Sequence, residues 1–101
     1  MKTLLNLTAA VLFSSLASVS FAGDAAAGKA KSMTCAGCHG ANGISNNPMW
    51  PNLAGQKQAY LASSLQMYRD GRRKNAMMSA MAKNLTDADI ANLAAYYSSL
   101  K

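Results

Sequence analysis

The sequence predicts an all-α domain with three main helices. Apolar residues recur with helical spacing near the C-terminus, and helix-capping residues and a glycine stop mark the expected helix ends. No stretch shows the strict alternation of apolar and polar residues that half-buried strands have. These observations favour a small helical protein and argue against folds built on a sheet.

Residues 1–22 have the pattern of a cleavable export signal. Lys2 is their only charged residue, residues 4–16 are mostly apolar, and residues 20–22 form a small-x-small cleavage site. Polar residues interrupt the apolar run, which therefore falls short of the ~18 uninterrupted apolar residues of a membrane span. We expect residues 23–101 to be one domain in the bacterial periplasm, without stable membrane insertion after cleavage.

The first two helices have recognisable boundaries. Asp24 is a suitable N-cap for a helix over residues 25–34, which delivers two cysteines at its end. A second helix is predicted over residues 56–70, with Gly71 as its C-terminal stop. One face of that helix carries Tyr60, Leu61, Ser64, Leu65 and Tyr68.

The last helix gives the clearest signal. Thr86 is its expected N-cap, and Asp87 and Asp89 in the first turn suit the positive end of the helix dipole. The apolar stripe that follows consists of Ile90, Leu93, Ala94, Tyr97 and Leu100. Between the helices we expect a Gly/Asn/Pro-rich loop over residues 40–55 and a Met- and Ala-rich connector over residues 75–84.

A domain as short as residues 23–101 buries little apolar surface, and such domains commonly need a staple. The chain has two cysteines, Cys35 and Cys38. A disulfide between them would close a very short loop and would restrict the unfolded chain little. We therefore expect the cysteines to hold a larger group.

The motif around the cysteines identifies that group. Cys35, Cys38 and His39 form the C-x-x-C-H pattern of c-type haem attachment. Two thiols at this spacing can form thioethers with the two vinyl groups of one haem, and the histidine can ligate its iron. A thioredoxin-like site would need a βαβ setting, and a zinc site would need a fourth strong ligand. The sequence therefore predicts one covalently attached haem c.

These segments resemble the class I c-type cytochromes, and most closely a single-haem unit of the periplasmic di-haem cytochromes c. The matching segments are GDAAAG at 23–28, CAGCHG at 35–40, PNLAGQ at 51–56, DGR at 70–72, and residues 77–97. The resemblance implies the all-α cytochrome c fold, with crossed terminal helices around the haem. It also implies that His39 is the proximal iron ligand and that a methionine before the last helix is the distal one. Unlike the di-haem proteins, this chain has one attachment motif.

Three methionines are candidates for the distal ligand: Met77, Met78 and Met81. In the family, the ligand precedes the leucine that introduces the last helix by seven positions, and counting back from Leu85 gives Met78. Met77 and Met81 remain alternatives, because methionine also serves as flexible core filling.

The resemblance assigns supporting roles to two further residues. Pro51 lies twelve residues after His39, where the family has a proline whose carbonyl accepts a hydrogen bond from the proximal imidazole. Such an acceptor fixes the orientation and tautomer of a ligating histidine. Gly28 is expected to let the first and last helices approach closely, opposite Leu93, Tyr96 or Tyr97.

The expected coordination determines the expected function. With histidine and methionine both bound, the iron has no open position, which disfavours substrate or oxygen chemistry and leaves electron exchange. We expect an electron carrier that shuttles single electrons between respiratory or other redox partners, and no enzyme. The alternatives are a cytochrome subunit of a larger periplasmic oxidoreductase and a haem-based ligand sensor.

The net charge of the chain indicates which classes of partner it could bind. The chain has 10 Lys plus Arg against 4 Asp plus Glu, a formal net charge of +6. Basic residues gather at Arg69, Arg72, Arg73 and Lys74. This group could steer a redox protein with an acidic docking surface, neutralise haem propionates, or form a solvated face. We do not expect nucleic-acid binding by an exported domain.

Overall fold

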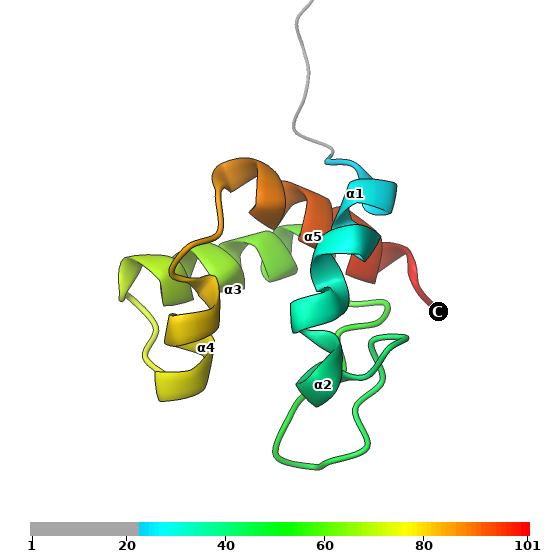
Figure 1. Cartoon of the computed structure of the whole chain (residues 1–101), viewed down its shortest axis with the longest axis horizontal. Helices are drawn as coiled ribbons and strands as arrows, with labels where there is room; N and C mark the ends of the chain where they lie inside the picture. The colour runs from blue at the N-terminus through cyan, green and yellow to red at the C-terminus, as the bar shows by residue number, and fades with distance from the viewer. Residues whose placement is uncertain (1–22) are drawn as a thin grey trace, which may run out of the picture.

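The computed structural model describes residues 23–101, and that part of the chain is helical and contains no strand (Figure 1). The expected export signal, residues 1–22, lies outside the described residues. The helices are α1 (Ala25–Lys31), a 3₁₀ turn (Ser32–Thr34), α2 (Ala36–His39), α3 (Gln58–Asp70), α4 (Ala76–Ala82) and α5 (Asp87–Ser99). None of these helices is long and apolar enough to cross a membrane.

The N-terminal helix begins as predicted and ends differently. The Asp24 side chain accepts hydrogen bonds from the backbone N–H groups of Ala26 and Ala27, at 2.9 and 3.2 Å. The helix expected over residues 25–34 is α only to Lys31, and its last turn is 3₁₀. The Ser32 hydroxyl donates to the Lys29 carbonyl at 2.6 Å, which satisfies an acceptor at the end of the α-helical turns. The short helix α2 then carries the second cysteine and His39.

Helix α3 begins two residues later than predicted and ends where expected. Gly71 follows it with φ 82°, a left-handed conformation that glycine adopts readily, and its N–H donates to the Tyr68 carbonyl. The Arg73 N–H then donates to the Met67 carbonyl at 3.1 Å. The chain therefore reverses direction after Gly71 and returns along the end of α3.

Helix α4 lies in the segment for which the sequence predicts a connector, residues 75–84. The Asn75 side chain caps it by accepting from the backbone N–H groups of Met77 and Met78, at 3.1 and 3.0 Å. The helix itself consists of alanines and methionines with one serine, and the first two types favour helices. The prediction of a connector is therefore wrong for Ala76–Ala82, which form an α-helix.

Helix α5 has the predicted N-cap. The Thr86 hydroxyl accepts from the Asp89 N–H and the Asp89 carboxylate accepts from the Thr86 N–H, both at 3.0 Å, which is a capping box. The predicted apolar stripe is buried at Ile90, Leu93, Ala94 and Tyr97. The sequence therefore identified both the start of this helix and its inner face.

The same capping box predicts a pH dependence. The hydrogen bond from the Thr86 backbone, together with the nearby Lys31 ammonium, lowers the pKa of Asp89 from its ordinary value of 3.8. Because the folded-state pKa is the lower one, the stabilisation is complete above pH 3.8 and is lost as the pH falls through the folded value. We expect Asp89→Asn to reduce the acid-induced loss of stability, measured by denaturant unfolding between pH 7 and pH 2. An unchanged pH profile in the variant would contradict this role.

Helices α1 and α5 cross in close contact (Figure 1). A Cβ atom on Gly28 would overlap the Asn92 carbonyl oxygen and would lie 2.8 Å from the Tyr96 Cβ. The Asn92 side chain accepts from the Asp24 N–H at 2.8 Å, and the Lys31 ammonium lies 3.4 Å from an Asp89 carboxylate oxygen. The predicted close approach at Gly28 is confirmed, with the Asn92 backbone as the main contact.

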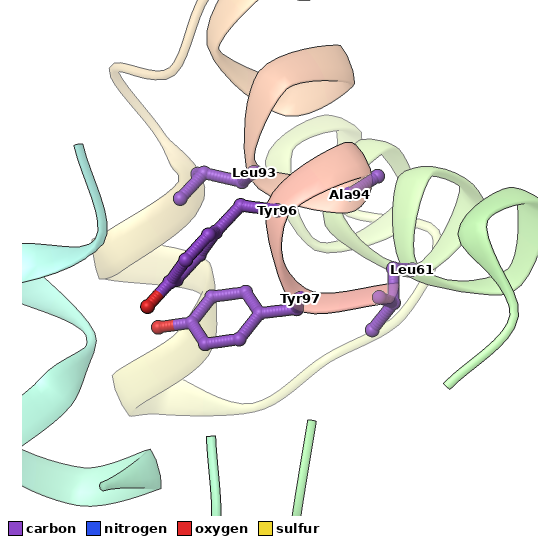
Figure 2. Close-up of a cluster of buried hydrophobic side chains, with 5 residues drawn as sticks. All are labelled: Leu61, Leu93, Ala94, Tyr96 and Tyr97. Atoms are coloured by element: carbon purple, nitrogen blue, oxygen red, sulfur yellow. The ribbon is translucent and has the colours of Figure 1, made fainter. Parts of the chain in front are cut away.

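The core cluster consists of Leu61 from α3 and of Leu93, Ala94, Tyr96 and Tyr97 from α5. In Figure 2 the rings of Tyr96 and Tyr97 extend from α5 beside each other, with their centroids 5.0 Å apart. Among the described residues, only Ile90 and Leu93 are large side chains that are fully buried. This core is small, as the length of the domain predicts.

Candidate functional site

A cavity of about 760 Å³ is enclosed by residues from α2, the loop that follows it, α3, α4 and α5. Its volume lies within the ~300–1,000 Å³ that binding pockets for small organic molecules usually have. Several large apolar side chains that line it are strongly exposed: Met49 (80%), Met77 (54%), Tyr60 (51%) and Met81 (45%). The protein therefore presents apolar surface that a large apolar group in this cavity would cover.

Both cysteines line the cavity. Both are free and half-buried. Cys35 is the N-cap of α2 and Cys38 lies within that helix. Burial is the largest cause that raises the pKa of the Cys35 thiol, and this disfavours the thiolate on which redox and metal-binding cysteines depend. Both thiols are therefore placed where a group in the cavity could be attached to them.

His39 lies buried at the end of α2 and also lines the cavity. Its Nδ1 is 2.8 Å from the Pro51 carbonyl oxygen, which is the hydrogen bond that the resemblance implies. A carbonyl can only accept, so Nδ1 carries a proton, and in the neutral ring Nε2 then has the lone pair for a ligand. Among residues 23–101, no group of three or more His, Cys, Asp or Glu side chains could hold a metal ion.

Helix α4 brings all three candidate methionines to the cavity wall. Met78 and Met81 lie three residues apart and share a helix face, whereas Met77 is rotated by about 100° from Met78. Met78 is half-buried, while Met77 and Met81 are exposed. Met78 is thus the least exposed of the three residues.

The tryptophan and the four tyrosines of the described residues divide into two sets. Trp50, Tyr60, Tyr68 and Tyr97 line the cavity, and Tyr96 does not. The Tyr97 hydroxyl is hydrogen-bonded to Ser32 and Cys35, and burial raises its pKa well above the usual value. Tyr97 therefore joins α5 to the segment that carries the cysteines.

The basic residues near the end of α3 have different environments. Arg69 binds the Asp87 carboxylate at 2.8 Å and the Asp70 carboxylate at 3.3 Å. Arg72 binds Asp70 at 3.1 Å and lies outside the cavity wall. Arg73 lines the cavity, which the sequence could not indicate, because its place depends on the chain reversal after Gly71.

A second, more open depression of about 590 Å³ lies between α3 and α5. It is lined mainly by alanines, with Gln58, Gln66, Asp87 and Ile90. None of the predicted site residues lies there, so the chemistry of the molecule is concentrated in the larger cavity.

Comparison with known proteins gives a consistent result. A family model described as Cytochrome c matches residues 25–101. Cytochrome c-554(548) of Halomonas halodenitrificans is 56% identical over 81 residues, which cover 77% of this chain and 98% of that protein. The thiosulfate dehydrogenase electron acceptor of Thiomonas intermedia is 47% identical over 77 residues, covering 75% of this chain and 36% of that protein.

The fold agrees with a solved structure as well. The reduced recombinant cytochrome c4 of Pseudomonas stutzeri has a TM-score of 0.75 and 42% identity, over 79% of this chain and 47% of that one. This chain therefore spans nearly all of one relative and less than half of the other two.

Proposed function

The chain belongs to the cytochrome c family, and we propose that it shuttles single electrons between redox partners through a haem ligated by His39 and Met78. Members of this family with the C-x-x-C-H motif hold haem covalently, and this chain has one such motif. The cofactor is therefore one haem c. Its attachment to Cys35 and Cys38 and the two axial ligands are the residue-level part of the proposal.

The cavity fits this group. Two free thiols, an imidazole with an available Nε2 and a half-buried thioether line one apolar space. When bound, the haem supplies a one-electron couple at its iron. The role of the chain is to hold the histidine ring through the Pro51 carbonyl and to exclude water with the apolar wall.

The observation that carries the functional proposal is the combination of donors in the cavity wall. The wall offers one imidazole and three thioethers on α4 as possible iron ligands. Among residues 23–101, no Asp or Glu side chain lines it. Two protein ligands would leave no open position for substrate, and the wall contains no carboxylate for proton transfer. Electron exchange requires neither.

We expect Met78→Ala to remove the ferric methionine–iron charge-transfer band from the optical spectrum of the purified protein. The reason is that alanine has no donor atom to replace the thioether. The matched variants Met77→Ala and Met81→Ala should keep the band, although both residues line the same cavity. A band that persists in Met78→Ala and disappears in either of the others would reassign the ligand.

The proposal includes export to the periplasm, with cleavage between Ala22 and Gly23. The sequence pattern of residues 1–22 supports it. The intact mass of the purified protein tests it directly. We expect the mass of residues 23–101 plus one haem, and a mass that includes residues 1–22 would contradict the proposed cleavage.

We further propose that the partners include a dehydrogenase with an acidic docking surface. Residues 23–101 contain 9 Lys plus Arg and 4 Asp plus Glu, a net charge of +5. This charge and the name of the Thiomonas relative, an electron acceptor of thiosulfate dehydrogenase, support this choice. Electron transfer from such a donor should slow as salt screens the attraction, measured by stopped-flow spectroscopy. A rate independent of ionic strength would contradict electrostatic docking. Stable co-elution with a donor would instead favour a subunit, and carbon monoxide binding by the reduced protein would favour a sensor.

A further inference from the structure

Helix α4, which carries Met78, depends on the rest of the molecule for its position. It has seven residues, and an isolated helix of this length is not stable in water. Met78 lies four residues before Ala82, close to the same helix face, and Ala82 is fully buried. Contacts that fix the end of α4 therefore also fix the place of Met78.

Local hydrogen bonds shape this part of the chain. The Asn75 side chain caps the start of α4, and the Thr86 side chain caps the start of α5. At the end of α4, the Leu85 N–H donates to the Ala82 carbonyl at 3.1 Å and closes a turn. These bonds define the conformation of residues 75–89. The position of these residues relative to the cavity depends on packing and on bonds from other elements.

Arg69, in the last turn of α3, supplies such bonds. Its Nη1 donates to the Leu85 carbonyl at 3.3 Å and lies 2.8 Å from an Asp87 carboxylate oxygen. One guanidinium thus holds the turn that follows α4 and the first residue of α5. In Figure 1 the chain between α4 and α5 passes beside the end of α3.

The environment of these bonds decides which of them is the stronger hold. The Arg69 side chain is 23% exposed, whereas that of Asp87 is 88% exposed. Solvent therefore screens the ion pair, while the hydrogen bond to the Leu85 carbonyl is partly buried. Leu85 also packs against the core cluster, so the bond reaches a residue that is itself held in place.

Arg72 offers a matched comparison. It carries the same charge and binds Asp70 at 3.1 Å, and its side chain is 62% exposed. Neither Arg69 nor Arg72 lines the cavity. An effect of Arg69 on a group in the cavity must therefore pass through the residues that join α4 to α5.

We propose that Arg69 is a positioning residue that keeps Met78 on the haem iron, because its bonds to the Leu85 carbonyl and to Asp87 hold α4 against the cavity. The inference rests on ligation by Met78, as proposed above. Without these bonds α4 would leave its place more often, and a small external base could then take the position of the thioether. Arg69 thus slows the dissociation of Met78 and keeps the site closed to other ligands.

The test measures imidazole binding to the oxidised haem protein, expressed from the full-length chain. At saturating imidazole, the rate at which the methionine–iron band disappears in a stopped-flow spectrometer equals the rate of Met78 dissociation. We expect Arg69→Gln to raise this limiting rate by about three- to tenfold, since it removes one charge-assisted hydrogen bond and one partly screened ion pair. Arg72→Gln loses the same charge and should change the rate by less than about 1.5-fold.

Two further variants separate positioning from a general loss of stability. Asp24→Ala removes the N-cap of α1 and should lower the midpoint of denaturant unfolding without changing the limiting rate. Arg69→Lys keeps the charge without the planar fork and should give a rate between those of wild type and Arg69→Gln.

Equal limiting rates in Arg69→Gln and Arg72→Gln, or an equal increase in Asp24→Ala, would overturn the inference. If Arg69→Gln does not fold, Arg69→Lys decides, and a rate equal to that of wild type overturns the inference. An oxidised wild-type protein without the methionine–iron band would instead refute the proposed ligation.

Discussion

Replacing Cys35 and Cys38 together by alanine is expected to abolish cooperative folding of the chain. Without covalent attachment the haem would be held only by its ligands, and in residues 23–101 the large side chains that are fully buried are Ile90 and Leu93. We expect the double variant, purified without haem, to lose most of the roughly 5–15 kcal/mol that stabilises a typical small domain. Thermal unfolding followed by circular dichroism measures this loss.

The physical reason lies in the cavity wall. Met49, Tyr60, Met77 and Met81 are 45–80% exposed in the chain itself and line the space that the haem would fill. Removal of the group returns this apolar surface to water. Met77→Ala with its haem attached is the matched control and should unfold cooperatively. A cooperative transition in the double variant, with a midpoint near that of the control, would refute the claim that the haem supplies the missing core.

Replacing Gly28 by valine is expected to cause the second-largest loss of stability. A Cβ atom at this position would overlap the Asn92 carbonyl of α5, and this backbone group cannot rotate away as a side chain can. Helices α1 and α5 would have to separate. This would disturb the hydrogen bond from the Asp24 N–H to the Asn92 side chain and the ion pair of Lys31 with Asp89. We expect a loss of about 4 kcal/mol or more in denaturant unfolding of the haem protein.

Gly37→Ala is the control for this prediction. Gly37 lies in a helix, and a Cβ atom there has no protein atom within 4 Å. Its free energy of unfolding should change by less than about 1 kcal/mol. Similar losses in the two variants would show that the close helix crossing at Gly28 does not determine stability.

The elements that the sequence identified correctly are those with local signals. Asp24, Thr86 and Gly71 mark helix ends through their own side chains or conformations, and each does so in the structure. The inner face of α5 followed from helical periodicity alone. Helix α4 also has local signals in the sequence, namely the cap at Asn75 and the run of alanine and methionine that follows it. The prediction of a connector did not take them into account.

The remaining features depend on contacts between distant segments. The approach of Asn92 to Gly28 requires the crossing angle of two helices that the sequence does not specify. The place of Arg73 in the cavity wall requires the reversal after Gly71 and the neighbouring side chains of α3. Met77, Met78 and Met81 all line the same cavity, so their position there does not single out one ligand. The choice of Met78 rests on the family resemblance.

The central claim is that the chain is a one-electron carrier whose haem iron is ligated by two side chains of the protein and has no open coordination position. A potentiometric titration of the purified protein, followed by its optical spectrum, tests this claim most directly. We predict one reversible one-electron transition, with the methionine–iron band present in the oxidised protein and restored in full after each cycle. An irreversible transition, or an oxidised spectrum without that band, would contradict the account.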